Sequence, residues 1–136
     1  DRTRTYVRAS HQWVRKQKDW SSEDVERFKE AVTESLKGDH VDATNVATAV
    51  ISVPEEQDEY LEYLREEGLE DLTFEPDPQE RKRQTEYLRF EGDHGLQVRI
   101  EANAVGADKT LQYEWEAATN SWIVRIRTTR WERKPR

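Results

Sequence analysis

The chain has 136 residues and a formal net charge of −7, with 38% charged and 34% hydrophobic residues. It contains no cysteine, which excludes disulfides, thiolate nucleophiles and cysteine-ligated zinc. No apolar stretch approaches the length of a membrane span or resembles a signal peptide, so we expect no membrane partner and a cytoplasmic location.

Residues 4–18 begin the series of predicted helices. Tyr6, Val7, Trp13 and Val14 fit one helical stripe, and we interpret this segment as the end of a helix that begins upstream. Residues 1–21 are therefore predicted to be a helix end or a linker that precedes the domain. On this interpretation, the chain is a domain excised from a longer protein.

The next helices are predicted from their caps. Ser21 or Ser22 is suited to cap a helix over 22–37, which Gly38 would close. Asp42 would cap a short helix over 43–51, and Pro54 suits the first turn of a helix that ends at Gly68. Alternation over 71–75 predicts a short strand, and Asp77-Pro78 starts a further helical turn that reaches Leu88.

The last third alternates apolar and polar residues in three runs, 96–102, 111–116 and 122–127, divided by turn signals. Period-two alternation places apolar side chains on one face of each strand and polar side chains on the other. The runs predict an antiparallel meander with a buried face and a solvated face.

We therefore predict the α+β class, with several short helices packed on a three- to four-stranded antiparallel β-meander. A single domain would cover 22–129, with a helical half over 22–90, the meander over 95–129 and a basic tail over 130–136. The core is expected to be apolar and aromatic, and to comprise Val25, Phe28, Val32, Leu36, Tyr60, Leu61, Leu64, Leu96, Val98, Ile100, Tyr113, Trp122, Val124 and Ile126.

Short helices followed by strands suggest a winged helix, in which a helix-turn-helix would read DNA. Residues 55–67 contain seven acidic residues and one arginine, so DNA phosphates would repel this helix. We interpret it as a solvated acidic face, with contact to a basic partner or mimicry of nucleic-acid charge as the alternatives.

Metal binding and catalysis find no support in the sequence. His11, His40 and His94 are isolated from one another, whereas a metal site needs several converging ligands. No nucleophile elbow, phosphate-binding loop or zinc-protease motif is present. We expect no metal, no cofactor, no small-molecule substrate and no enzymatic activity.

The two ends of the chain are basic around an acidic middle. Residues 1–18 and residues 123–136 each hold six basic residues and one acid, which leaves a net charge of −17 over 19–122. Guanidinium groups suit phosphate, and the nearby Trp13 and Trp131 suit stacking on unpaired bases. The alternative is that the two ends face solvent separately or pair with the acidic middle. The candidate nucleic-acid-binding residues are Arg2, Arg4, Arg8, Arg15, Lys16, Lys18, Arg125, Arg127, Arg130, Arg133 and Lys134.

Gly95–Ala102 forms a glycine-led strand with alternating apolar residues, and Val105-Gly106 lies at the following turn. An aromatic strand with Tyr113, a turn at Thr119-Asn120 and a final apolar strand over 122–126 follow. Over about residues 22–129, the order of these motifs resembles the C-terminal region of the bacterial nucleoid-associated protein family of the NdpA (YejK) type, whose first strand has the form Gly-Leu-x-Ile-x-Phe-x-Ala.

The resemblance implies association with the bacterial chromosome, in the nucleoid, without catalytic residues or a cofactor. We therefore expect a non-enzymatic nucleoid-associated domain that contacts double-stranded DNA independently of base sequence, directly through its basic ends or through the rest of a longer protein. The alternative is a protein-interaction or dimerisation module, which uses the acidic helix 55–67 and serves as an accessory to a DNA-processing or phage-defence system.

Overall fold

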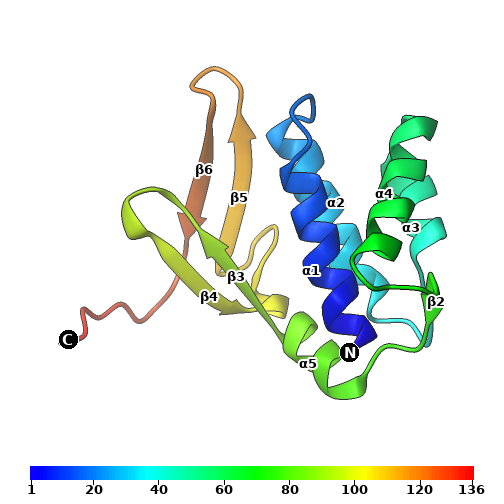
Figure 1. Ribbon diagram of the computed structural model, residues 1–136. Coiled ribbons are helices and arrows are strands. Elements are labelled where there is room, and N and C mark those ends of the chain that lie inside the picture. The colour runs from blue at the N-terminus through cyan, green and yellow to red at the C-terminus, as the bar shows by residue number, and fades with distance from the viewer. The chain divides into compact units, whose positions relative to one another are not determined.

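The computed structural model describes residues 1–136, which divide into two units, residues 1–85 and residues 86–136. The first unit is mainly helical and the second is built from β-hairpins (Figure 1). The predicted α+β class is confirmed. No helix is both long and apolar enough to cross a membrane.

The first unit follows the predicted order of elements. Its helices are α1 (Arg2–Arg15), α2 (Ser22–Ser35), α3 (Ala43–Val50), α4 (Pro54–Glu66) and α5 (Pro78–Glu86), and its strands are β1 (Val41–Asp42) and β2 (Thr73–Phe74). The Ser21 side chain accepts a hydrogen bond from the Asp24 amide, and Asp42 accepts one from the Thr44 amide. The helices predicted over 22–37, 43–51 and 54–68 are thus confirmed, as is the strand within 71–75, which pairs with β1.

Helix α1 begins at Arg2, where the Asp1 carboxylate accepts hydrogen bonds from the Thr3 and Arg4 amides. Its inner face, which includes Tyr6 and Val14, is fully buried in the core of the first unit. The helix is therefore an integral part of this unit, whereas the sequence placed residues 1–21 outside the domain.

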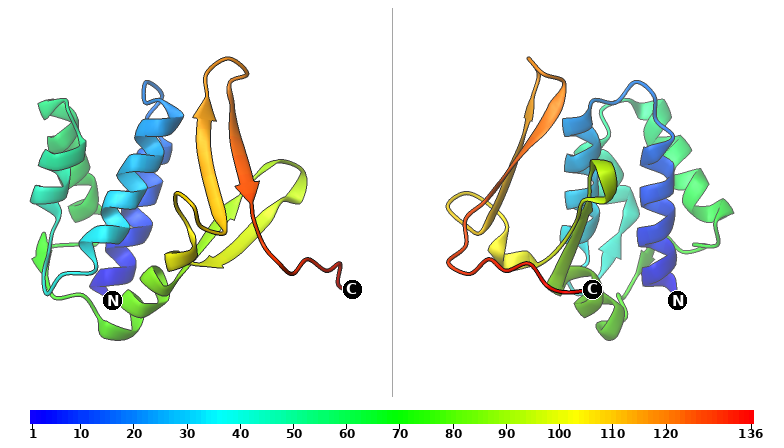
Figure 2. Two further views of the ribbon diagram at one scale, coloured as in Figure 1. Left: turned by 180° about the vertical axis from the view of Figure 1, so that it is seen from behind. Right: turned by 90° about the vertical axis from the view of Figure 1, so that its left-hand side faces the viewer.

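An aromatic cluster on three helices forms the centre of this core. Trp13 of α1 packs against Phe28 of α2 and Tyr60 of α4, with ring centroids 5.7 and 5.1 Å apart. Trp20 closes the cluster against Trp13 and Phe28. Such ring pairs stabilise beyond their buried area, so the cluster joins α1, α2 and α4 into one core. Figure 2 shows the ribbon of α1 beside those of α2 and α4.

Two pairs of hydroxyl groups lie within or beside the core. The Tyr60 hydroxyl is 2.7 Å from Ser10 Oγ, and the Tyr6 hydroxyl is 2.8 Å from Ser35 Oγ. Burial raises the pKa of Tyr6 to about 12 and raises the pKa of Tyr60 as well, so both phenols keep their protons and can act as donors.

We expect Tyr60→Phe to lower the free energy of unfolding by about 1–2 kcal/mol, because the fully buried Ser10 hydroxyl loses its tyrosine partner. Urea unfolding followed by circular dichroism measures this loss. Tyr63→Phe on the same helix is the matched control, because its half-buried hydroxyl makes only long hydrogen bonds, of 3.3 and 3.4 Å. Equal losses in the two variants would contradict a stabilising role for the hydrogen bond between Tyr60 and Ser10.

The second unit contains four strands, β3 (Tyr87–Glu91), β4 (Gln97–Glu101), β5 (Leu111–Glu116) and β6 (Ser121–Ile126), with 3₁₀ turns at Asp93–Gly95 and Ala102–Ala104. They form two separate antiparallel hairpins, β3–β4 and β5–β6, instead of one continuous meander. Residues 87–88, which the sequence placed in a helical turn, belong to β3. The short loop 92–96, closed by a 2.8 Å hydrogen bond from the Gly92 amide to the Leu96 carbonyl, makes β3 the nearest partner for β4.

The predicted core is correct in the helices and wrong in the strands. Phe28, Val32, Leu36, Tyr60 and Leu64 are fully buried, whereas Val25 and Leu61 are half-buried. In the second unit Leu96, Trp122, Val124 and Ile126 are 54%, 37%, 46% and 45% exposed, and Val98, Ile100 and Tyr113 are half-buried. Small two-stranded sheets cover only part of their apolar faces, so alternation here predicted the face but not the burial.

Candidate nucleic-acid interface

Helix α1 carries a row of arginines on its outer face. Arg4, Arg8 and Arg15 are separated by four and seven residues, which places them on the same face of a helix. All three are exposed, and α1 contains no acidic residue. We call these three residues the α1 arginine row.

The cations of the first unit differ in their partners. Arg4 Nη2 lies 3.4 Å from the Glu80 carboxylate, which is itself buried. A hydrogen bond from Gln84 is the main reason why the Glu80 pKa lies below its ordinary 4.5, and Arg4 lowers it further. Lys16 Nζ lies 4.9 Å from the centre of the Tyr63 ring. Among the predicted cations of residues 1–18, only Arg4 pairs with an acidic side chain, and the others are Arg2, Arg8, Arg15, Lys16 and Lys18.

His11 lies beside the α1 arginine row and is half-buried. Its Nε2 atom is buried without a hydrogen-bond partner. Burial lowers the pKa of His11 to about 4, and the charges of Lys29 and Arg15 lower it further. The imidazole is therefore neutral near pH 7. The sequence indicated the place of His11 beside the arginines, because it lies three residues after Arg8 on the same helix.

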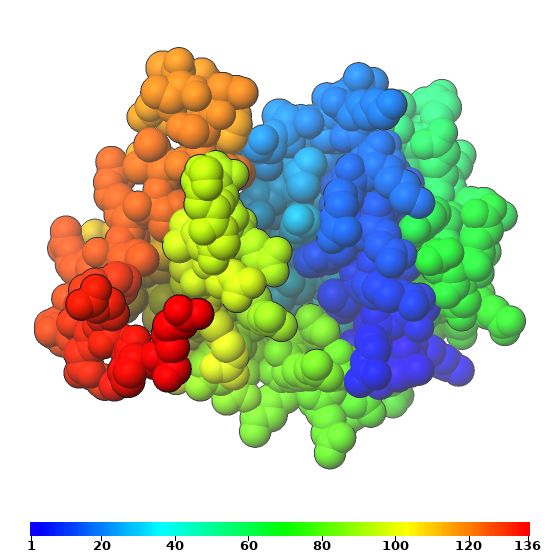
Figure 3. Space-filling model, turned by 60° about the vertical axis from the view of Figure 1, so that its left-hand side comes forward, coloured from blue at the N-terminus to red at the C-terminus, as the bar shows by residue number.

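The second predicted basic cluster belongs to β6 and the segment after it. Arg125 pairs with Glu114 across the hairpin at 3.2 Å, and Arg130 and Lys134 both pair with Glu132, at 2.8 and 3.0 Å. Arg127 and Arg133 have no acidic partner. Residues 127–136 form no helix or strand and lie open at the surface, in red in Figure 3.

Two tryptophans accompany these cations. Trp131 is 80% exposed, more than any other large hydrophobic side chain of the protein. Trp122 lies on β6, where its ring contacts Trp115 and Tyr113 at centroid distances of 5.5 and 5.7 Å. Cations and exposed indoles thus occur together in this unit, as the sequence predicted for Trp131.

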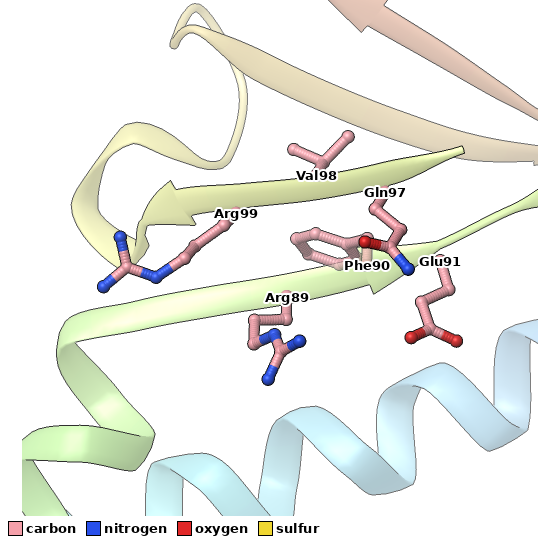
Figure 4. Close-up of a pocket in the computed structure, with 6 residues that line it drawn as sticks. All are labelled: Arg89, Phe90, Glu91, Gln97, Val98 and Arg99. Atoms are coloured by element: carbon pink, nitrogen blue, oxygen red, sulfur yellow. The ribbon is translucent and has the colours of Figure 1, made fainter. Parts of the chain in front are cut away.

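The sequence missed a hollow of about 460 Å³ on the β3–β4 hairpin, lined by Arg89, Phe90, Glu91, Gln97, Val98 and Arg99. Arg89 lies directly opposite Arg99 in the register, and the Arg99 guanidinium lies 3.9 Å from the centre of the Tyr87 ring. In Figure 4 Arg89 and Glu91 project from one side of the hairpin and Val98 from the other. The alternation of apolar and polar residues over 87–91 could have indicated this face, but it was obscured by the helical turn that the sequence predicted up to Leu88.

The acidic helix predicted over 55–67 is α4, and most of its carboxylates face solvent. Glu56 accepts a hydrogen bond of 3.0 Å from the Trp20 indole, and Glu62 lies 3.9 Å from Arg65. The buried side of the helix, with Tyr60 and Leu64, packs in the core. In the first unit, positive charge therefore gathers on α1 and negative charge on α4.

The α1 arginine row and the C-terminal cluster belong to different units, so each is a surface of its own unit. No group of three or more histidine, aspartate or glutamate side chains is arranged to hold a metal ion. No protein-family model, curated protein or solved structure matches the chain. The family resemblance therefore stays a prediction.

Proposed function

We propose that this chain is a non-enzymatic domain that associates with bacterial chromosomal DNA through phosphate contacts, independently of base sequence. The observation that carries this proposal is the α1 arginine row, in which Arg8 and Arg15 are exposed without an acidic partner. The resemblance to the nucleoid-associated family supports the same assignment and a place in the nucleoid.

The dimensions of the row suit a phosphate backbone. Arg4 and Arg15 are separated by about 16 Å along the helix axis, given a rise of about 1.5 Å per residue. One DNA strand presents a phosphate about every 3.4 Å along its axis, so the row spans several phosphates. Guanidinium groups bind phosphate oxygens in pairs, and such contacts position a protein on DNA without reading its sequence.

The distribution of charge in the first unit favours one approach of DNA. The carboxylates of α4 repel phosphates, whereas α1 carries only basic charged groups. Lys16 lies over the Tyr63 ring at the surface, so it can exchange this contact for a phosphate at little cost. Arg4 instead pairs with the buried Glu80 carboxylate, which would lose a cationic partner. Arg8 and Arg15 are therefore the arginines of the row that can bind phosphate without such a loss.

Reversing the charge of Arg8 and Arg15 together, in Arg8→Glu/Arg15→Glu, should weaken binding to a generic DNA duplex at least about tenfold. It should also reduce the salt dependence, the slope of log K against log salt concentration, by about 2. Fluorescence anisotropy of a labelled duplex, titrated at several salt concentrations, measures both quantities.

Arg27→Glu/Arg65→Glu is the matched control. It changes the net charge equally, at exposed arginines that already pair with Asp24 and Glu62 outside α1. If both double variants weaken binding equally, only net charge matters and the assignment of the α1 arginine row is wrong. Absence of duplex binding by the unaltered chain at about 50 mM salt, where phosphate contacts are strong, would reject the proposed function.

A further inference from the structure

We propose that residues 121–136, which form β6 and the segment after it, bind single-stranded nucleic acid. In this site bases stack on the exposed rings of Trp122 and Trp131, while Arg127 and Arg133 hold the phosphates. The inference rests on the proposed function and names a second substrate class and a second surface for it.

Trp131 carries the first part of the argument. Its indole is 80% exposed and has no ring contact, although it is one of the largest apolar groups in the protein. It stands between Arg130 and Arg133 in a segment without regular secondary structure. An indole held in water among cations is suited to stack on a planar partner that brings negative charge with it.

Trp122 provides a second ring, which is held in place by neighbouring aromatic side chains. Its neighbours Tyr113 and Trp115 meet it edge to face, with interplanar angles of 70° and 71°, and Tyr113 in turn packs on Phe90. These contacts hold Trp122 in place and leave 37% of its side chain exposed. Aromatic rings on the face of a small sheet are a common platform for unpaired bases.

The net positive charge of residues 121–136 favours a polyanion as the partner. Glu132 is the only acidic residue after Glu116, and Arg130 and Lys134 both bind it. Arg127 follows directly after β6 and Arg133 lies two residues after Trp131, and neither has an acidic partner. The cations therefore alternate with the two rings along the chain, as phosphates alternate with bases along a strand.

The exposed rings of Trp122 and Trp131 favour a single strand over a duplex as the partner. Bases in a duplex are already stacked on their neighbours, so an exposed indole can stack only on an unpaired base. Trp131 lies nine positions after Trp122, and a fully extended chain of this length spans about 30 Å. This length is enough for several nucleotides, in line with site sizes of about 4–16 nucleotides in other single-strand binders.

The test uses the full chain, a labelled oligothymidine of about 20 nucleotides and a labelled duplex of equal length, with binding read by anisotropy. We expect Trp131→Leu to weaken binding of the oligothymidine about tenfold and to leave duplex binding unchanged. Trp131→Phe, which keeps an aromatic ring, should retain most of the affinity. Leu96→Ala is the control for loss of an exposed apolar group, since Leu96 is 54% exposed in the same unit and has no ring.

The outcomes separate this inference from the proposed function. Duplex binding that depends on the α1 arginine row, together with an oligothymidine affinity insensitive to Trp131→Leu, would overturn the inference and leave the proposed function standing. If the unaltered chain binds neither the duplex nor the oligothymidine, both proposals are rejected. Self-association in sedimentation velocity that Trp122→Leu abolishes, without an effect on oligothymidine binding, would identify this face as a protein interface and also overturn the inference.

Discussion

Trp13→Ala should lower the free energy of unfolding of the helical unit by about 3–5 kcal/mol, the usual range for truncating a buried tryptophan. Trp13 is only 4% exposed and contacts the rings of Trp20, Phe28 and Tyr60 at centroid distances of 5.6, 5.7 and 5.1 Å. The substitution leaves a cavity where α1, α2 and α4 meet. Because typical domains are stable by only about 5–15 kcal/mol, the loss is a large part of the total.

Urea unfolding followed by far-ultraviolet circular dichroism reports on this unit, because all five α-helices begin within it. Trp131→Ala is the matched control, since it makes the same chemical change at a side chain that is 80% exposed. This control should stay within about 0.5 kcal/mol of the unaltered protein, as most surface substitutions do. Equal shifts for the two variants would show that the aromatic cluster does not hold the unit together.

Acidification from pH 7 to pH 4 should destabilise the protein by about 3 kcal/mol through His11 alone. Its pKa is about 4 in the folded state, against an ordinary value of 6.5. A group whose pKa is lower in the folded state takes up its proton more readily in the unfolded chain, so stability falls as the pH drops below 6.5 and levels off below about 4. The difference of about 2.5 pKa units, at about 1.36 kcal/mol each, sets the magnitude.

His11→Gln isolates this contribution, because glutamine does not titrate and all other groups are shared with the unaltered protein. The difference in unfolding free energy between the two proteins should change by about 3 kcal/mol between pH 7 and pH 4, in favour of the variant at acid pH. A difference independent of pH would show that the His11 pKa is close to its ordinary value in the folded protein. The ring resonances of His11, followed by NMR against pH, measure the same pKa directly.

The local signals in the sequence were enough to place the helices of the first unit. The Ser21 and Asp42 side chains each accept a hydrogen bond from a free amide in the first turn of α2 and α3, and Pro54 opens α4 without a lost hydrogen bond. These signals act within a few residues, so they can be found without knowledge of the fold. The α1 arginine row follows in the same way from helical spacing alone.

The alternation of apolar residues also determined which side chains share a face of each strand. Tyr113 lies opposite Val124 and Trp115 opposite Trp122, so the apolar residues of β5 and β6 do form one face. Alternation does not indicate which strands pair with each other, because any two strands with the same period fit equally well. The pairing of β4 with β3 instead of β5 was therefore decided by loop closure over residues 92–96.

Burial and charge pairing were decided only by the tertiary structure. Arg4 and Glu80 are 76 residues apart, and Lys29 of another helix helps to lower the pKa of His11. The second unit exposes Trp122 and Val124, which the pattern alone would bury. A periodic pattern states which way a side chain points relative to its own strand or helix, whereas burial depends on what the rest of the chain places over it, and that sum of distant contacts exists only after folding.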